Sequence, residues 1–147
     1  MNLLSNPAHP AASRAGKIAA ILLLGVVAFQ AALAAGAPWG VATQGGGNEG
    51  VLPDTLRIGS VITLVLYALL AAVAGTSLIP AAARRRILYA ATAVMVVATM
   101  LNIASPSFIE RIIWAPITIV LVLTLWRAAR AAAIRPLGRM SVAGQLA

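Results

Sequence analysis

Hydrophobic residues fall into four long runs along the chain, and polar stretches of unequal length separate them. The runs cover about residues 18–35, 56–79, 87–104 and 112–133. An α-helix rises about 1.5 Å per residue, so roughly 20 apolar residues cross the hydrocarbon core of a bilayer. The first run suffices for an upright helix, and the third is long enough only with residues near Ser105. The pattern predicts an all-α membrane protein in which four transmembrane helices form an antiparallel bundle.

The composition places these helices in a membrane rather than in a soluble core. Hydrophobic residues make up 61% of the 147 residues and charged residues 10%, whereas a typical soluble domain is roughly 25% charged. So few polar groups cannot cover the apolar surface in water, and the length allows one domain. The absence of cysteine excludes a disulfide scaffold, a thiolate metal site and catalysis by cysteine.

Three polar segments complete the predicted organisation around a transmembrane domain at 18–133. Residues 1–17 are expected to form an N-terminal tail, residues 36–55 an outer loop, and residues 134–147 a C-terminal tail. The stretch 36–57 is the only long polar interruption between hydrophobic runs, and it holds six glycines and two of the three acidic residues. Glycine allows this loop backbone conformations that are closed to other residues.

Basic residues divide unequally between the two ends of the predicted helices. Nine of the eleven lie in the N-terminal tail, between the second and third runs or after the fourth, and only Arg57 and Arg111 lie at the opposite ends. The positive-inside rule therefore predicts a bacterial cytoplasmic (inner) membrane protein with both termini cytoplasmic. Glu49, Asp54 and Glu110 then face outward. The net charge of +8 is explained as a topology signal, so we expect the lipid bilayer, and not nucleic acid, as a partner.

The first run allows a second interpretation. Arg14 and Lys17 precede it, and Ala32-Leu33-Ala34 resembles the A-x-A cleavage site of a secretory signal peptide. The run is longer than the usual core of a signal peptide and three more runs follow, which favours a retained helix. The sequence leaves open whether this run is retained or cleaved.

Residues at the outer helix ends have ordinary structural roles available. Asp54 or Thr55 can cap the second helix. Ser107 and Glu110 match the capping box S-x-x-E, in which each side chain accepts a hydrogen bond from the other residue's backbone N–H. Arg57 either extends to the interface or pairs with one of the three acidic residues.

Polar and aromatic residues within the helices also have structural interpretations. Gln30 is expected to bond a neighbouring helix rather than a substrate. Thr92 and Thr99 share a helix face and are expected to pack against a neighbouring helix. Trp114 either marks the interface or turns inward, and Pro116 predicts a kink in the fourth helix.

A candidate site can be assembled from side chains at the outer ends of the helices. In one interpretation, its charged groups bind a zwitterionic or amphipathic ligand. In the other, which the sequence favours, they form ion pairs that hold the loop over the bundle. The candidate residues are Trp39, Asp54, Arg57, Asn102, Ser105, Ser107, Glu110, Arg111 and Trp114.

Enzyme motifs are absent from the sequence. It contains no H-E-x-x-H, P-loop or G-x-S-x-G motif, and no cluster of histidines and carboxylates for a metal. We therefore assign no catalytic, cofactor-binding or metal-binding residue and expect no cofactor. A membrane enzyme that uses Glu110, Asp54 and Arg57 is the least favoured hypothesis. No charged residue lies in the middle of a run, which counts against a proton-coupled exporter.

Short motifs in the loop and after the third run carry a resemblance. They are GAPWG at residues 36–40, GG at 45–46, GVLP at 50–53 followed by Leu56-Arg57, and N-x-x-S-x-S-x-x-E-R-x-x-W-x-P at 102–116. This set resembles uncharacterised small four-span bacterial integral membrane proteins over roughly residues 25–125. The resemblance implies the four-helix architecture and the outer loop, and no catalytic activity.

Two classes of function follow from the sequence. The favoured one is a structural or interaction protein, a small bundle that packs against itself or another membrane protein. Ala68, Ala72 and Gly75 support it, since small residues on one helix stripe allow helices to approach closely. The alternative is a binding or transport module for a small or lipid-like ligand at an outer-face crevice.

Overall fold

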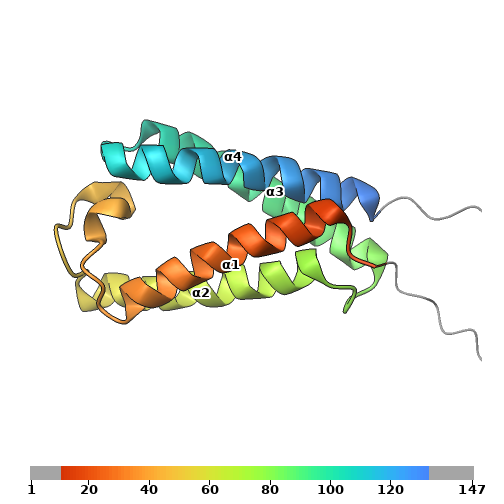
Figure 1. The fold of residues 1–147 in the computed structure, drawn as a ribbon, viewed down its shortest axis with the longest axis horizontal. Coiled ribbons are helices and arrows are strands. Elements are labelled where there is room, and N and C mark those ends of the chain that lie inside the picture. Colours follow the sequence, from red (N-terminus) through yellow and green to blue (C-terminus); the bar gives the residue numbers. More distant parts are fainter. Residues whose placement is uncertain (1–10, 133–147) are drawn as a thin grey trace, which may run out of the picture.

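The computed structural model describes residues 11–132, and four long helices make up most of them (Figure 1). Helix α1 covers Arg14–Ala34, α2 covers Asp54–Gly75, α3 covers Ala81–Ala104 and α4 covers Phe108–Ala131. Two short 3₁₀ helices, η1 (Gly40–Ala42) and η2 (Gln44–Gly46), lie in the loop between α1 and α2. Residues 11–132 contain no strand, and the predicted all-α bundle of four antiparallel helices is confirmed.

The helix ends differ from the ends of the apolar runs. Helix α1 begins at Arg14 because Ser13 Oγ accepts a hydrogen bond from the Gly16 N–H. Helix α3 begins at Ala81, so the arginine triplet lies inside the helix rather than before it. Helix α2 ends at Gly75, before the predicted end at residue 79, because Thr76 is extended. Hydropathy marks the part of a helix that fits lipid, whereas capping and hydrogen bonds decide where the helix itself ends.

The predicted tails lie largely outside the described residues. This holds for residues 1–10 and for the whole C-terminal tail at 134–147, with its Arg135 and Arg139. The rest of the predicted N-terminal tail overlaps the first turn of α1.

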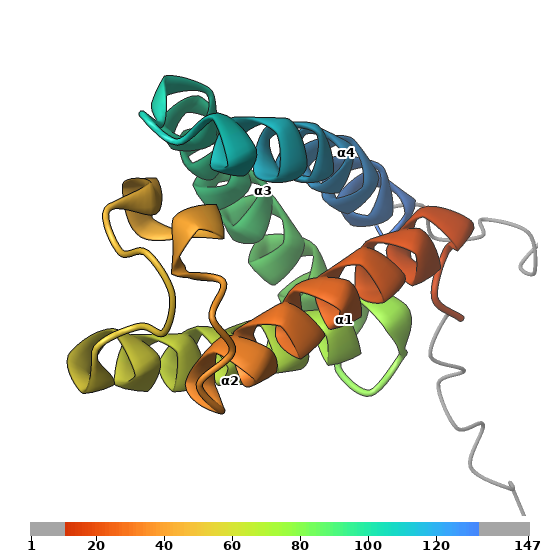
Figure 2. The same cartoon turned by 60° about the vertical axis from the view of Figure 1, so that its left-hand side comes forward.

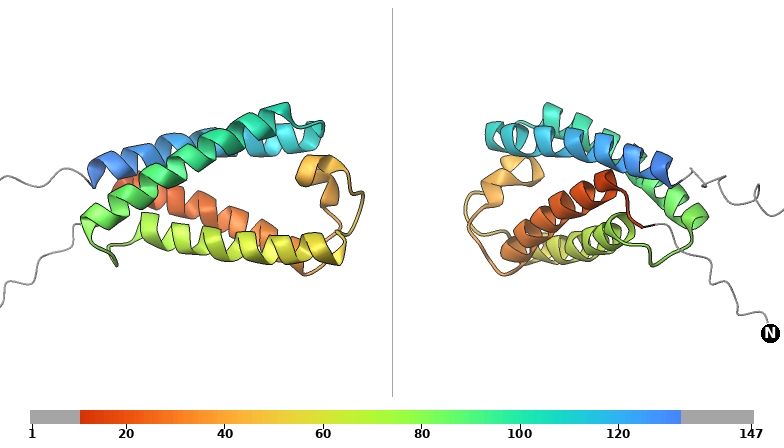
Figure 3. Two further views of the ribbon diagram at one scale, coloured as in Figure 1. Left: turned by 180° about the vertical axis from the view of Figure 1, so that it is seen from behind. Right: turned by 45° about the vertical axis from the view of Figure 1, so that its right-hand side comes forward.

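The four helices form two antiparallel hairpins, α1–α2 and α3–α4 (Figures 1 and 2). Helix α1 also packs against α4, whereas α2 and α3 lie together only near the turn that joins them (Figure 3). The hairpins therefore lie close at one end and spread apart at the other. We call the close end the arginine end and the spread end, where the loop between α1 and α2 lies, the loop end.

Charges of the described residues separate between these two ends. The loop end carries Arg57, Arg111 and the three acidic residues of the chain. The arginine end carries Arg14, Lys17, Arg84, Arg85, Arg86, Arg127 and Arg130. The antiparallel fold thus brings together basic residues that are far apart in the sequence.

Small residues let the helices approach closely in the core near the arginine end. A Cβ added to Gly75 would lie 2.8 Å from the Ala20 Cβ, and one added to Gly16 would clash with the Ala74 carbonyl oxygen. Gly75 therefore belongs to the contact between α1 and α2, while Ala72 of the predicted stripe is exposed. The buried core residues are Ala19, Leu23, Ala71, Ala74, Leu88, Met95, Leu121, Leu125, Ala128 and Ala129.

One arginine of the triplet is buried in this region. Arg84 has 4% of its surface exposed, and it donates from Nε to the Val73 carbonyl oxygen at 3.1 Å and from Nη2 to that of Ala74 at 2.8 Å. Both carbonyls belong to the last turn of α2, where no backbone N–H of the helix reaches them. Arg84 thereby joins the start of α3 to the end of α2, and Arg85 and Arg86 stay exposed.

The outward surfaces of the helices are apolar. Large hydrophobic side chains are exposed on all four helices, for example Ile21, Leu66, Val94 and Leu123. Each helix is long and apolar enough to cross a membrane. The chain is therefore a multi-pass membrane protein whose exposed apolar faces contact lipid.

Candidate functional site

The loop between α1 and α2 crosses from one hairpin to the other. After Ala34 the chain runs to the start of α4, where η1 and η2 lie, and then returns to the start of α2 (Figures 1 and 2). Gly45 and Gly46 have φ values of 77° and 72°, a conformation that favours glycine. A Cβ on Gly46 would lie 2.7 Å from the Ser107 Cβ. The glycines thus let the loop backbone lie directly on the turn between α3 and α4.

Three side chains of the second hairpin bind this loop. Ser107 Oγ donates to the Val41 carbonyl oxygen at 2.8 Å, and Trp114 Nε1 donates to that of Ala42 at 2.7 Å. The Gly45 N–H donates to Glu110 Oε2 at 2.8 Å. We call Ser107, Glu110 and Trp114 the loop latch, because they fix the loop across the spread ends of the two hairpins.

The predicted capping box is half right. Ser107 Oγ accepts from the Glu110 N–H at 3.2 Å, so Ser107 caps α4 as expected. The return bond from Glu110 is wrong, because the Ser107 N–H donates to Ser105 Oγ at 3.2 Å instead. The Glu110 carboxylate accepts from the Ser105 hydroxyl at 2.5 Å and from Gly45. Ser105 satisfies the backbone donor locally, which leaves the carboxylate for the loop.

A cavity of about 580 Å³ lies between the hairpins beneath the latched loop. Its volume is within the range of roughly 300–1,000 Å³ that is usual for small-molecule sites. All four helices, the loop and the α3–α4 turn line it. The lining residues are Val26, Phe29, Gln30, Thr43, Gln44, Gly45, Tyr67, Met95, Ala98, Leu101, Asn102, Ala104, Ser105, Pro106, Glu110, Trp114, Ile117, Thr118 and Leu121.

The cavity is polar at one end and apolar at the other. Glu110 lies in the first turn of α4, whereas Leu121 lies eleven residues, or roughly 16 Å of helix rise, further into the bundle. Polar side chains from three other segments, Gln30, Gln44 and Asn102, join Glu110 among the lining residues. The deeper lining consists mainly of aliphatic residues and methionine, and it also includes Tyr67 and Thr118. This arrangement matches a ligand that has one polar end.

Of the described residues, Glu110 is the only acidic one that lines the cavity, and none of their lysines or arginines lines it. It is 9% exposed, and it takes part in no ion pair within residues 11–132, where the only ion pair is that of Arg57 with Asp54. Two donors bond its Oε2, while its Oε1 has no hydrogen-bond partner among the described residues. A nearly buried carboxylate thus lines the cavity without an ion-pair partner among residues 11–132.

An aromatic cluster adjoins the polar end. The Phe29 ring meets the Trp114 ring edge-on, with centroids 4.7 Å apart, and stacks with Trp39 at 6.0 Å. Of the two alternatives for Trp114, the inward one is correct, since its indole N–H bonds the loop and its ring lines the cavity. Trp39 is about half exposed and covers Phe29 from outside.

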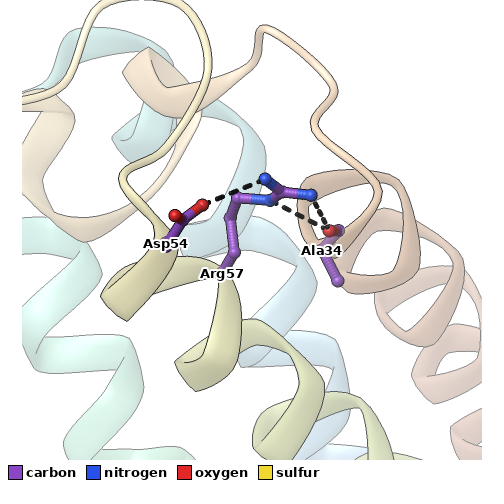
Figure 4. A network of polar contacts seen from close by, with 3 residues as sticks. All are labelled: Ala34, Asp54 and Arg57. Atoms are coloured by element: carbon purple, nitrogen blue, oxygen red, sulfur yellow. Dashed lines mark hydrogen bonds and ion pairs between the residues drawn. The ribbon is translucent and has the colours of Figure 1, made fainter.

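Arg57 and Asp54 lie elsewhere at the loop end. Arg57 donates from Nε and Nη2 to the Ala34 carbonyl oxygen at 3.0 and 2.9 Å, and its Nη1 lies 3.2 Å from Asp54 Oδ1 (Figure 4). Arg57 therefore joins the end of α1 to the start of α2. Asp54 does not cap α2, because the N-cap residue is Pro53 and no side chain bonds the free N–H groups there.

The nine residues predicted for the site are therefore divided by the structure. Asn102, Ser105, Glu110 and Trp114 line the cavity. Ser107 lies beside it in the loop latch, and Trp39 packs on the aromatic cluster. Asp54 and Arg57 form a separate ion pair, and Arg111 is exposed with its guanidinium 6.0 Å from the Phe108 ring. The carboxylates and guanidiniums do not meet in one crevice.

Sequence reasoning missed several lining residues, including Phe29, Thr43, Gln44 and Tyr67. For Thr43 and Gln44, the sequence signal nearby is the run of glycines at 45–47, which indicates an unusual loop conformation. Gln30 lines the cavity, and its side chain makes no hydrogen bond to residues 11–132, so the expected bond to a neighbouring helix is wrong. Thr92 and Thr99 bond carbonyl oxygens four residues earlier in their own helix.

No group of three histidine, aspartate or glutamate side chains within residues 11–132 could hold a metal ion. Comparisons of the chain with protein-family models, with curated proteins and with solved structures gave no match. The resemblance to small four-span bacterial membrane proteins stays a prediction.

Proposed function

We propose that the protein is a binding module of the bacterial cytoplasmic membrane, with both termini in the cytoplasm. Its ligand is a small, amphipathic, lipid-like molecule held between the two hairpins at the loop end. The observation that carries this proposal is a cavity of about 580 Å³ that is polar beneath the loop and apolar further in. The cavity opens to the surface, since Gln44, Leu101 and Pro106 in its lining are exposed, so a ligand can enter it.

The loop supports the same proposal. It extends from the first hairpin to the second, and Ser107, Glu110 and Trp114 hold it over the cavity. Such a loop lies over the polar end of the cavity, while the apolar end lies further along the membrane-spanning helices. A ligand with a polar head and an apolar body would satisfy both ends.

A cavity-filling substitution tests this function. Ala98 lines the cavity on α3, and Ala93 is exposed on the same helix. We expect Ala98→Trp to abolish saturable binding of decan-1-ol and decylamine to the protein in nanodiscs, measured by calorimetry and thermal shift. Ala93→Trp is the matched control and should bind as the unmodified chain does.

Binding that survives Ala98→Trp, or no saturable binding by the unmodified chain, would contradict the proposal. In that case the cavity would have no role in ligand binding. The structural or interaction bundle favoured by the sequence would then be the better interpretation.

A further inference from the structure

We propose that the ligand of this cavity carries an organic ammonium group, which Glu110 binds, on a single apolar chain. This inference rests on the proposed function and adds the chemical class of the ligand. It starts from the unusual state of one side chain, a carboxylate in an apolar bundle that has no cationic partner among residues 11–132.

Glu110 lines the cavity, and one of its two carboxylate oxygens, Oε1, has no hydrogen-bond partner among the described residues. The other oxygen, Oε2, accepts hydrogen bonds from the Gly45 N–H and the Ser105 hydroxyl. No fully buried side-chain oxygen among the described residues lacks a partner, so Oε1 keeps some exposed surface on a residue that lines the cavity. An ammonium N–H can therefore approach Oε1 without breaking the loop latch.

No lysine or arginine among the described residues forms an ion pair with Glu110, whose carboxylate is stabilised by the first turn of α4 and by two hydrogen-bond donors only. Arg57 is occupied by the Ala34 carbonyl oxygen and Asp54, and Arg111 is exposed beside Phe108. A carboxylate removed from water is stabilised by a positive charge within about 4–6 Å. A cationic ligand supplies that charge, whereas an anionic ligand would be repelled.

The walls around Glu110 also suit a cation. Phe29 and Trp114 present aromatic rings to the cavity, and an organic ammonium group is attracted to the face of such a ring. The amide side chains of Gln30 and Asn102 supply further carbonyl oxygens for its N–H groups. Met95, Ile117 and Leu121 line the deeper part, where an alkyl chain is expected.

The cavity excludes a phosphate by the same reasoning. No arginine or lysine within residues 11–132 lines it, so the phosphate of an aminophospholipid would lie near Glu110 without a counter-charge from these residues. The geometry therefore favours a single-headed amine over a zwitterionic lipid, although both carry an ammonium group. Binding measurements can distinguish the simple amine from the zwitterionic lipid.

The test compares three probes of equal chain length, decylamine, decan-1-ol and decanoic acid, by calorimetry in phosphatidylcholine nanodiscs. We expect decylamine to bind roughly tenfold or more tightly than decan-1-ol, and decanoic acid to bind most weakly. Glu110→Gln should remove the preference for the amine over the alcohol, and the loop latch should persist because glutamine can still accept from Gly45 and Ser105. Asp54→Asn removes a carboxylate at the same end but outside the cavity. It should leave the affinities for all three probes unchanged.

Equal affinities for the amine and the alcohol, or an amine preference that survives Glu110→Gln, would overturn this inference. The proposed function would stand in that case, provided that Ala98→Trp still abolished binding of decan-1-ol. Tighter binding of lysophosphatidylethanolamine than of decylamine would overturn the exclusion of phosphate. Loss of all binding in Glu110→Gln, with the thermal stability unchanged, would also contradict the inference, because the alcohol needs no carboxylate.

Discussion

Gly46 lies where the loop touches the turn between α3 and α4. Its φ is 72°, and an added Cβ would lie 2.7 Å from Ser107 Cβ and 2.9 Å from its Oγ. Ser107 caps α4 and also donates to the loop, so a shift of this side chain would disturb two contacts. A side chain at position 46 therefore acts on the latch itself.

We predict that Gly46→Ala destabilises the protein by about 1–3 kcal/mol, because alanine is strained at this φ and collides with Ser107. Gly47→Ala is the control, since Gly47 has a φ of −71° and no atom within 4 Å of an added Cβ. Its effect should be within about 0.5 kcal/mol. Thermal unfolding of both variants in one detergent measures the difference, and equal melting temperatures would contradict the prediction.

At the scale of elements, each end of the first hairpin is held by an arginine that bonds backbone carbonyls. At the loop end, Arg57 of α2 bonds the Ala34 carbonyl oxygen at the end of α1. At the arginine end, Arg84 of α3 bonds the last turn of α2. In lipid a carbonyl without a partner is costly, so helix ends that lie at membrane depth need such donors.

Arg84→Met should cost about 1.5–3 kcal/mol, because it keeps the length of the side chain and removes two charged hydrogen bonds. Arg85→Met is the matched control, since Arg85 is exposed and lies 5.7 Å from the Tyr89 ring. It should change stability by less than about 0.5 kcal/mol. Loss of helical circular dichroism on heating gives both values. Equal decreases in the stability of the two variants would show that the buried contacts of Arg84 do not stabilise α3 against α2.

At the scale of the whole molecule, the two ends differ in charge as well as in shape. Basic residues gather where the hairpins lie close, and the acidic residues gather where they spread apart. The positive-inside rule predicts that the arginine end of such a bundle lies in the cytoplasm. The proposed ligand site would then lie toward the outer face of the membrane.

Cysteine labelling tests this orientation, because the chain has no native cysteine. Val51 lies in the loop and Leu78 between α2 and α3, and both are exposed. We expect Val51→Cys to react with a membrane-impermeant maleimide in spheroplasts, and Leu78→Cys to react only after lysis. The reverse pattern would mean that the arginine end faces outward.

The sequence by itself determined the number and kind of the elements. Four apolar runs define four helices, and the distribution of arginine and lysine separates their two ends. Local signals were also sufficient for the Ser107 cap, since its bond to the Glu110 N–H spans only three residues. These features depend on hydropathy and on neighbours in the chain, which a sequence states directly.

Only the tertiary structure decided which polar groups meet. Glu110 was expected to bond its own turn, but it bonds Gly45, which lies 65 residues away, and Arg57 bonds the Ala34 carbonyl oxygen. Almost every residue carries the same backbone N–H and carbonyl groups. Residue types therefore do not indicate which backbone group a side chain such as Glu110 or Arg57 will bond. The cavity likewise exists because the hairpins spread apart beneath the loop, and this depends on packing between helices that are distant in the chain.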